Sequence, residues 1–551
     1  MAMRALAAAF NRVRQDDSKD VPLEDLKDTA LPPAVPAPPY RHAAPSGPWP
    51  WMDVNAVVFK SSPTVNIDQS WPGYPQNQFG NWTQDQVERS QMLERCSKNQ
   101  SSTVYWMDVL HSREFAASNI GGNGHITVVD TQREGSEGEF WNILQGQRPK
   151  NIRVRSLFVD DLTSPVLRML GTKYNIEPFF FTSSINWIPS RYQEAPIHGE
   201  GDHITITLPF VRAMPGCPTL KSAGTKINTQ AHYPMGDQML VIDLLAIHMV
   251  RGVNTNTIIS YHPDSAWRRT SAKQLHSLMQ LVGGSVYWQK IFSKSEDPTF
   301  VFLAILWYAL YAWDESFELL DNHVSDLESQ VLKDHGLSRE LHILQAHLLH
   351  YQALLHSFEV SVTFIEKTQN PAMESSVFSD EQRVESNGLM KRECENLIGE
   401  IDRLEKRRMM MSSRLKNATD LAYASVNLQD SKQTRTLTET TVRDSAAMKQ
   451  IAYLTMIFLP ASFLASVFGM NVAEINPTSL ETIPHYVETT ISLTLLTVYI
   501  VITLQTHSSF HKDNATFLQR AAWPVLSLRR IVFKTPAGAK NASAKTVDDM
   551  A

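Results

Sequence analysis

The sequence has little cysteine and no marked excess of one charge. Its 551 residues include three cysteines, Cys96, Cys217 and Cys394, which lie far apart and form no CxxC motif. This spacing excludes a disulfide framework and a cysteine zinc site, and it is typical of a protein in a reducing compartment. The net charge is only −6, which argues against a nucleic-acid partner held by bulk attraction to phosphate.

Catalytic signatures are also missing from the sequence. It contains no P-loop, no GxGxxG motif opening a helix and no nucleophile elbow. The loop IHGEGDH (197–203) and the helical pair His347 and His350 carry metal-ligating residue types, but neither matches an established zinc signature. We interpret the first as a solvated loop and the second as ordinary helix-surface residues. The sequence therefore predicts that the protein is not an enzyme and has no resident cofactor.

The longest absence is that of positive charge, since no Lys or Arg occurs between Lys449 and Lys512. Within this interval, residues 451–470 are uncharged and apolar enough to span a hydrocarbon core of ~30 Å. A second stretch, 489–510, is rich in threonine and is a weaker candidate, because its apolar centre falls just below the usual minimum length. Positive flanks on both sides predict a transmembrane hairpin with an outer loop at 471–488 and both chain ends in the cytoplasm or matrix.

The composition divides the rest of the chain into four further segments. We expect a disordered Pro-rich N-terminal tail over 1–52, a cytoplasmic mixed α/β domain over 53–265, long helices and a stalk over 266–449, and a cytoplasmic C-terminal tail over 511–551, with the hairpin at 450–510 between the last two. The first fifteen residues also faintly resemble a mitochondrial presequence, which is the alternative to a plain tail.

Local patterns predict the elements of these segments. β-Branched runs favour short strands at 125–131, 152–159, 204–211, 238–242 and 257–261, and residues 164–170 favour a short helix. From Ala266 onward a helical period dominates. It predicts helices at 266–292, 299–332 (with a break not excluded) and 339–366, followed by a loop at 367–379.

A last, long helix begins near Glu381. Its apolar residues recur every three or four positions, with Arg408 breaking the stripe; they are Cys394, Leu397, Ile401, Leu404, Met411, Leu415, Ala418 and Ala422. Such spacing is typical of a coiled-coil seam. If the helix is unbroken to Met470, it is on the order of 130 Å long at ~1.5 Å per residue. We expect it to form a stalk that packs against copies of itself.

The end of the first span resembles a known family. The sequence IFLP is followed by Phe468-Gly469-Met470-Asn471, an acidic loop and a second short span, and this arrangement resembles the CorA family of divalent-cation transporters. The segments GDHITITLPF and NIEPFFFTSS resemble the fungal branch of that family. The resemblance implies a homopentamer with a central pore lined by the first transmembrane helix, held in membrane lipid. The family often carries Tyr where this chain has Phe468, which leaves ion preference open.

At the outer mouth of that pore, the resemblance implies a ring of five Asn471 amides. Mg²⁺ holds its water shell tightly, and a neutral amide oxygen can accept hydrogen bonds from that water without binding too firmly. Gly469 permits a tight backbone turn, and Met470 packs, since thioether sulfur is too soft a ligand for Mg²⁺. Zn²⁺, Co²⁺ and Ni²⁺ are alternative substrates. Glu474, Glu481 and Glu488 of the outer loop should attract cations to the mouth.

Helical spacing from Asn471 defines the residues that face the pore. Ser462, Leu459, Thr455, Ile451 and Met448 lie at steps of three or four, and Ser466 falls on the same side. The hydroxyls of Ser462 and Thr455 can contact the hydrating water, and the apolar members can gate by dewetting. The alternative is that this stripe faces lipid or a neighbouring helix.

The sequence leaves the sensing residues, the alternative function and the membrane undecided. In the family the inner domain senses divalent ions through carboxylates, and Asp160, Asp161, Asp314, Glu315 and Asp321 are candidates that cannot be ranked. A non-conducting membrane scaffold or sensor that keeps the stalk and hairpin is the alternative function. As an integral membrane protein the chain fits the plasma membrane best, with the vacuolar and mitochondrial inner membranes as alternatives.

Overall fold

A computed structural model of the chain describes residues 35–36, 44–47, 70–112, 114–117, 125–215, 227–230, 232–263, 270–331, 337–468, 482–504 and 517–522. The chain divides into two units, Met1–Ser425 and Val426–Ala551. The first unit combines a mixed β-sheet with long helices, and the second contains the remainder of the last long helix and two shorter helices.

The first unit is built on one sheet. Within the described residues it has nine strands, in the order β2-β1-β4-β9-β8-β6-β5, with β3 paired to β1 and β7 to β8. All pairs are antiparallel except β4 and β9, which run parallel. The strands are β1 (Ser101–Leu110), β2 (Phe115–Ala117), β3 (Ile126–Asp130), β4 (Ile152–Asp160), β5 (Ser190–Ile197), β6 (Gly201–Pro215), β7 (Tyr233–Met235), β8 (Gln238–Gly252) and β9 (Asn256–His262).

The five predicted strands are present as β3, β4, β6, β8 and β9. The two central ones, β6 and β8, are each 15 residues long and far exceed their predicted lengths. The predicted ranges stop just before Arg212 and Asp243, which are buried and paired with each other, with Nε and Oδ2 3.2 Å apart. A paired charge in the interior can therefore continue a buried strand.

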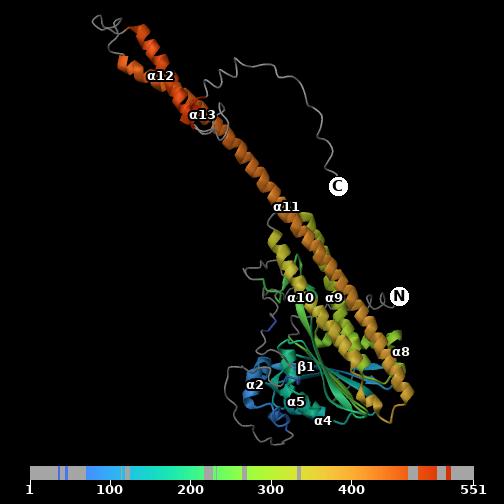
Figure 1. The fold of residues 1–551 in the computed structure, drawn as a ribbon. Coiled ribbons are helices and arrows are strands. Elements are labelled where there is room, and N and C mark those ends of the chain that lie inside the picture. The colour runs from blue at the N-terminus through green and yellow to red at the C-terminus, as the bar shows by residue number, and fades with distance from the viewer. Residues whose placement is uncertain are drawn as a thin grey trace, which may run out of the picture. The chain divides into compact units, whose positions relative to one another are not determined.

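Helices cover both faces of the sheet. On β6, the hydroxyl of Thr207 lies 3.1 Å from that of Ser183 in α6, whereas the guanidinium of Arg212 lies 4.8 Å from the centroid of the Tyr308 ring in α9. Residues an odd number apart on a strand point to opposite faces, so α6 and α9 lie on opposite sides of the sheet. Figure 1 shows α2, α4 and α5 on one side and α9 and α10 on the other.

The helices of the N-terminal part are short, and the later ones are long. The short ones are η1 (Trp71–Gly73), α2 (Gln84–Ser90), α3 (Met92–Cys96), α4 (Ser136–Gln145), α5 (Ser164–Tyr174) and α6 (Phe179–Ile185). They are followed by α7 (Ala272–Gly283), α8 (Val286–Lys294), α9 (Thr299–Gln330), α10 (Ser338–Lys367), η3 (Pro371–Glu374) and α11 (Asp380–Phe468). The predicted 266–292 helix is two helices, because Gly284 and Ser285 interrupt it; the helix predicted over 299–332 is unbroken.

The first part of α11 corrects the expected stalk seam. All eight apolar residues of the seam are buried, and they belong to the same hydrophobic cluster as the apolar side chains of α9 and α10. Polar contacts accompany this packing, since Arg403 pairs with Asp314 of α9 at 3.0 Å and Gln345 of α10 donates to Ser412 at 2.8 Å. Arg408, predicted to break the stripe, is itself buried and pairs with Glu405 at 2.7 Å. The seam is therefore part of the chain's own core.

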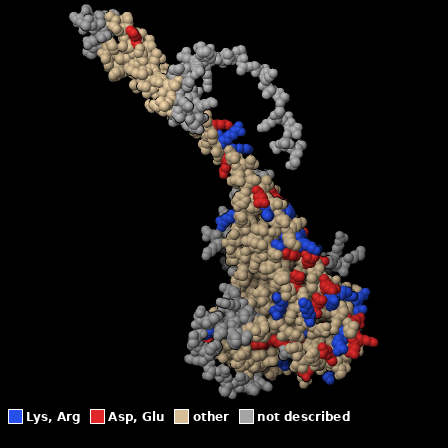
Figure 2. All heavy atoms as spheres, viewed as in Figure 1, with Lys and Arg blue, Asp and Glu red and all other residues tan. Residues whose placement is uncertain are grey.

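The second unit contains α11 from Val426 onward, α12 (Ile483–Leu504) and α13 (Phe517–Ala521). From Gln429 to Asp444 every residue of α11 is exposed. This segment is rich in Ser, Thr and charge, so it has little apolar surface to bury. The apolar ends of α11 and α12 lie side by side (Figure 1) and are almost free of charge in Figure 2. The unbroken helix predicted beyond Glu381 is confirmed as far as Phe468.

Candidate pore-lining segment

The central residues of the predicted site lie outside the described part of the chain. These are Gly469, Met470 and Asn471, together with Glu474 and Glu481 of the acidic loop. Glu488 is described and is an exposed residue of α12. The Gly-Met-Asn ring therefore stays a prediction, and the structure supplies the helix that leads up to it.

All six residues of the predicted pore stripe lie on α11 and are exposed in the chain. They are Met448, Ile451, Thr455, Leu459, Ser462 and Ser466. Three of them are large and apolar, and their side chains are about two-thirds exposed: Met448 66%, Ile451 66% and Leu459 65%. Such exposure is costly in water, so this face requires either lipid or other protein against it.

The stripe faces away from α12. The Tyr486 ring of α12 lies 6.0 Å from the Phe468 ring, and its hydroxyl lies 3.5 Å from the carbonyl oxygen of Ala461. Leu464, four residues before Phe468, lies on the same face and is half-buried. Because an α-helix turns by about 100° per residue, Ser462 and Ser466, two residues to either side of Leu464, point away from α12. The hairpin partner thus covers little of the stripe, and only Tyr486 of α12 borders it, at the groove shared with Thr455, Leu459 and Ser462.

The hydroxyl groups of the stripe are oriented as acceptors. Thr455 Oγ1 donates its proton to the carbonyl oxygen of Ile451, and Ser462 Oγ donates to that of Leu459 at 3.0 Å. A hydroxyl has one proton and two lone pairs. With the proton directed into the helix, the lone pairs remain for an outside donor. The water around a metal cation is such a donor.

An open groove of about 450 Å³ lies beside the stripe. Its lining is mostly apolar or small, and consists of Thr455, Phe458, Leu459, Ala461, Ser462, Ala465 and Tyr486. Three of these residues also belong to the stripe. Pro460, which has no N–H to donate, is a buried member of the same turn, and α11 continues through it without interruption.

Two helices in the described part of the chain are long and apolar enough to cross a membrane by length and composition alone, α9 and α11. α9 is a core helix of the first unit, because 78% of its most apolar window is buried. The apolar window of α11 is only 6% buried, as a lipid-facing or pore-facing helix would be. The second predicted span corresponds to α12, which begins six residues earlier than predicted. Over its described residues, α12 does not meet the same length and hydropathy criteria as α9 and α11.

Rival metal sites do not form in the described residues, where no group of three or more His, Cys, Asp or Glu side chains converges. The IHGEGDH loop is not a solvated loop throughout, because Asp202 is buried against Arg251; His198 contacts Glu374 at 2.6 Å. The prediction for His347 was wrong: it is buried, 5.1 Å from the Tyr233 ring between centroids. Burial lowers its pKa to about 4.

The candidate sensing carboxylates have other partners. Asp160 accepts a hydrogen bond from the backbone N–H of Ala272 at 2.8 Å, and burial raises its pKa to about 7. Asp314 and Asp321 pair with Arg403 and Arg414. These acids therefore have structural roles at the start of α7 and between α9 and α11.

Comparison with known proteins finds one family model that matches part of the chain. Residues 253–505 match the model of the CorA family, described as CorA-like Mg²⁺ transporter protein. This match covers somewhat less than half of the chain. The matched residues include β9, the helices α7 to α12 and the Gly-Met-Asn sequence, and they leave out most of the sheet.

Two solved structures are similar to the chain at low identity. One is the complete structure of the CorA magnesium transporter from Methanocaldococcus jannaschii, which is 14% identical over 67% of this chain and 94% of that chain, with a TM-score of 0.35. The other is the full-length CmaX protein, 11% identical over 73% of this chain and 98% of that chain, with a TM-score of 0.37. No curated protein sequence matches the chain.

Proposed function

We propose that the protein is a membrane channel or transporter for divalent metal cations, with Mg²⁺ as its principal substrate. The observation that carries the proposal is the stripe on α11: six exposed residues, free of charge, turned away from α12 and leading directly to Gly-Met-Asn. The CorA family match over residues 253–505 supports the same function. Within the family, the segments GDHITITLPF and NIEPFFFTSS favour the fungal branch.

In this proposal, five copies surround a central pore, and α11 of each copy contributes its stripe. Asn471 forms a ring of amides at the outer mouth, where it accepts hydrogen bonds from the water shell of the entering cation. Thr455 and Ser462 offer further acceptors inside, because their protons are already donated to the helix backbone. Met448, Ile451 and Leu459 form apolar constrictions that close by dewetting.

The charge-free lining suits a strongly hydrated ion. A carboxylate in a narrow pore would hold a divalent cation too firmly for rapid release, whereas neutral oxygen acceptors contact the hydrating water with moderate strength. Zn²⁺, Co²⁺ and Ni²⁺ would be selected less well, since they favour nitrogen and thiolate ligands, and the described part of the stripe offers only two serines, one threonine and the thioether of Met448 besides its aliphatic side chains.

Flux measurements on the purified full chain in liposomes test the proposal. We expect uptake of Mg²⁺ along its gradient, with slower uptake of Zn²⁺, Co²⁺ and Ni²⁺. Correctly inserted protein that passes none of these ions would favour the alternative, a non-conducting membrane scaffold. Leu459→Ala is an informative companion variant, because removal of an apolar constriction should increase resting flux, and a scaffold would show no change.

A further inference from the structure

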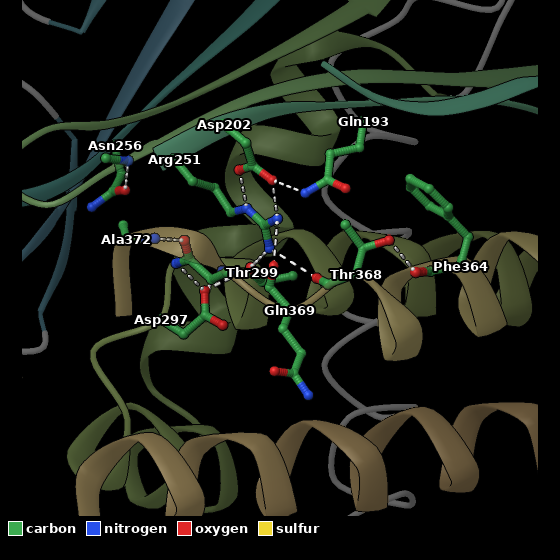
Figure 3. A network of polar contacts seen from close by, with 12 residues as sticks. Gln193, Asp202, Arg251, Asn256, Asp297, Thr299, Phe364, Thr368, Gln369 and Ala372 are labelled. Carbon is green, nitrogen blue, oxygen red and sulfur yellow. Dashed lines mark hydrogen bonds and ion pairs between the residues drawn. The ribbon is translucent and has the colours of Figure 1, made fainter. Parts of the chain in front are cut away.

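Arg251 lies at the centre of a buried polar network in the first unit (Figure 3). Its side chain and that of Asp202 are both 0% exposed. Each of its five N–H groups has an acceptor. Nε and Nη2 donate to the two carboxylate oxygens of Asp202. Nη1 donates to Thr299 Oγ1 at 3.1 Å and to the carbonyl oxygen of Thr368 at 3.2 Å, and Nη2 also donates to that of Gln369 at 3.3 Å.

These partners come from elements far apart in the sequence. Asp202 on β6 and Arg251 on β8 are direct cross-strand partners in the sheet. Thr299 is the first residue of α9. Thr368 and Gln369 directly follow α10 and begin the connector, defined as residues 368–379, which joins α10 to α11. The Arg251 side chain thus binds the first residue of α9 and the connector between α10 and α11.

Further contacts hold the connector to the same end of the sheet. The N–H of Gly199, in the turn between β5 and β6, donates to the carbonyl oxygen of Pro371 at 3.0 Å. Asn370 donates to Asp297 Oδ1 at 3.0 Å, just before α9. Gly201 allows β6 and β8 to approach closely here: its φ is +152°, and a Cβ would lie 2.0 Å from the carbonyl oxygen of Arg251. The connector is therefore docked by backbone as well as side-chain contacts.

A buried ion pair is a poor device for stability alone, because desolvation offsets much of its attraction and an apolar replacement is often as stable. What a guanidinium supplies is direction, since its five donors are fixed in one plane and fit one arrangement of acceptors. Two of these acceptors are backbone carbonyls of the connector. Arg251 thus specifies where the connector lies, and the connector leads after Ser379 directly into the first turn of α11.

We propose that Arg251 is a positioning residue that locks the connector to the sheet and thereby fixes the direction in which α11 begins. The connector and the first turn of α11 open together when the lock is lost, while the sheet stays folded. This proposal concerns the first unit alone and holds whether or not the chain transports cations.

The sheet offers a matched control. Arg153 on β4 is also buried and donates to backbone carbonyls, among them those of Phe292 at 3.2 Å and Glu296 at 3.2 Å. It therefore holds the loop before α9, including Asp297, and makes no direct hydrogen bond that the structure shows to residues of the connector. Arg251→Lys and Arg153→Lys each keep the charge and remove the planar fork, so they carry comparable costs in the core but act on different segments.

Hydrogen exchange of the full-length protein tests the lock. We expect Arg251→Lys to speed exchange at least tenfold at the Met373 and Ser375 amides, which are hydrogen-bonded within the connector, and in the first turn of α11. The β6 and β8 amides should keep the exchange rates of the parent. Arg153→Lys should speed exchange mainly around Ser295 and affect the connector less than Arg251→Lys does, because Arg153 reaches the connector only indirectly, through Asp297 and Asn370.

The distance between two spin labels gives a second measurement, and a general loss of stability would not change it. Val384 of α11 and Val128 of β3 are exposed, at 71% and 54%. Cys96 and Cys394 are buried and should not take up the label. With Cys217 replaced by Ser and labels at Val384→Cys and Val128→Cys, the distance distribution should broaden at least twofold in Arg251→Lys only.

Parent-like exchange in the connector of Arg251→Lys, or equal effects of the two arginine variants there, would overturn the proposal. If Arg251→Lys does not fold, Asp202→Asn replaces it, because it removes the charge that orients the Arg251 guanidinium and leaves the cap of η3 at Asn370 intact. Tenfold faster exchange at Met373 in that variant supports the proposal, and an unchanged rate contradicts it.

Discussion

Arg414 of α11 lies between two acids of α9, with Nη1 2.6 Å from Asp321 Oδ1 and Nη2 2.7 Å from Glu328 Oε2. Arg403, further back on α11, pairs with Asp314 at 3.0 Å. The acids lie seven residues apart along α9, so they form a row of ion pairs beside the buried seam. These carboxylates contribute to the packing of α11 on α9, which accounts for acids that the sequence left as candidate sensors.

Removal of the Arg414 charge should cost little and depend on salt. All three side chains at this site are about 30% exposed, and partly exposed pairs contribute roughly 0.2–1 kcal/mol each. We expect Arg414→Gln to lower the free energy of unfolding by about 1 kcal/mol at low ionic strength and by less at high salt. Urea titrations at two salt concentrations measure this, and a loss that is independent of salt would argue against a screened ion pair.

Charged substitutions in the seam should unfold the chain instead of merely dissociating copies. Ile401 and Leu404 are 2% and 0% exposed, and an uncompensated buried charge costs about 3–5 kcal/mol. Ile401→Asp and Leu404→Asp should each lower the unfolding midpoint strongly. Met409→Asp and Met410→Asp are matched controls on the same helix, because those residues are 48% and 50% exposed. Variants of Ile401 that keep the parent's stability while losing oligomeric mass would restore the seam as an assembly contact.

Asp160 should make the first unit less stable as the pH rises. Burial is the main cause that raises its pKa from 3.8 to about 7, and the neighbouring Asp161 adds to the shift. A pKa raised in the folded state means that the contribution of Asp160 is fully present below about pH 4 and is lost as the pH passes through about 7.

Asp160→Asn isolates this contribution, because the amide oxygen can still accept from Ala272 and cannot ionise. The variant should gain stability relative to the parent between pH 5 and pH 8, on the order of a few kcal/mol, since each pKa unit corresponds to about 1.4 kcal/mol. Thermal midpoints across this range measure the difference. A gap between variant and parent that does not grow with pH would show that Asp160 is already ionised in the folded protein at pH 5.

The absence of Lys and Arg between Lys449 and Lys512 predicts that both chain ends lie on the same side of the membrane. Reporter tags at the two termini, read by protease access in sealed vesicles, should therefore be protected or cleaved together. Opposite placement would leave one span instead of two and remove the hairpin from the account.

Much of the fold is readable from the sequence where local pattern and burial agree. The helices α9, α10 and α11 and the strands β3, β4 and β9 follow their predicted positions closely. Strand β1 was not predicted. Its sequence, SSTVYWMDVL, mixes polar and apolar residues, and Asp108 is accommodated only because Arg155 of β4 pairs with it at 2.8 Å.

The sequence could not show what the long helix packs against. A seam of period three and four is the same whether its partner is a second copy or the chain's own α9 and α10, since both bury the same stripe. Ile401 and Leu404 therefore fitted both arrangements. The same limit applies to Arg251, whose acceptors include the backbone carbonyls of Thr368 and Gln369 and leave no mark in the sequence. The pore stripe was predicted from helical period and the family resemblance, and it stays a prediction, because apolar residues outside the stripe, such as Phe458 and Phe463, are exposed as well.

The most direct test of the central claim is the rate of Mg²⁺ uptake by Asn471→Ala in liposomes. The variant removes an amide from every copy at once and leaves the stripe on α11 untouched. A hydrogen bond with a charged partner contributes roughly 1.5–3 kcal/mol, so loss of the ring should slow uptake about tenfold or more. Leu504→Ala, at an exposed position on α12, is the control and should keep the parent's rate. Uptake by correctly assembled Asn471→Ala at the parent's rate would contradict the account.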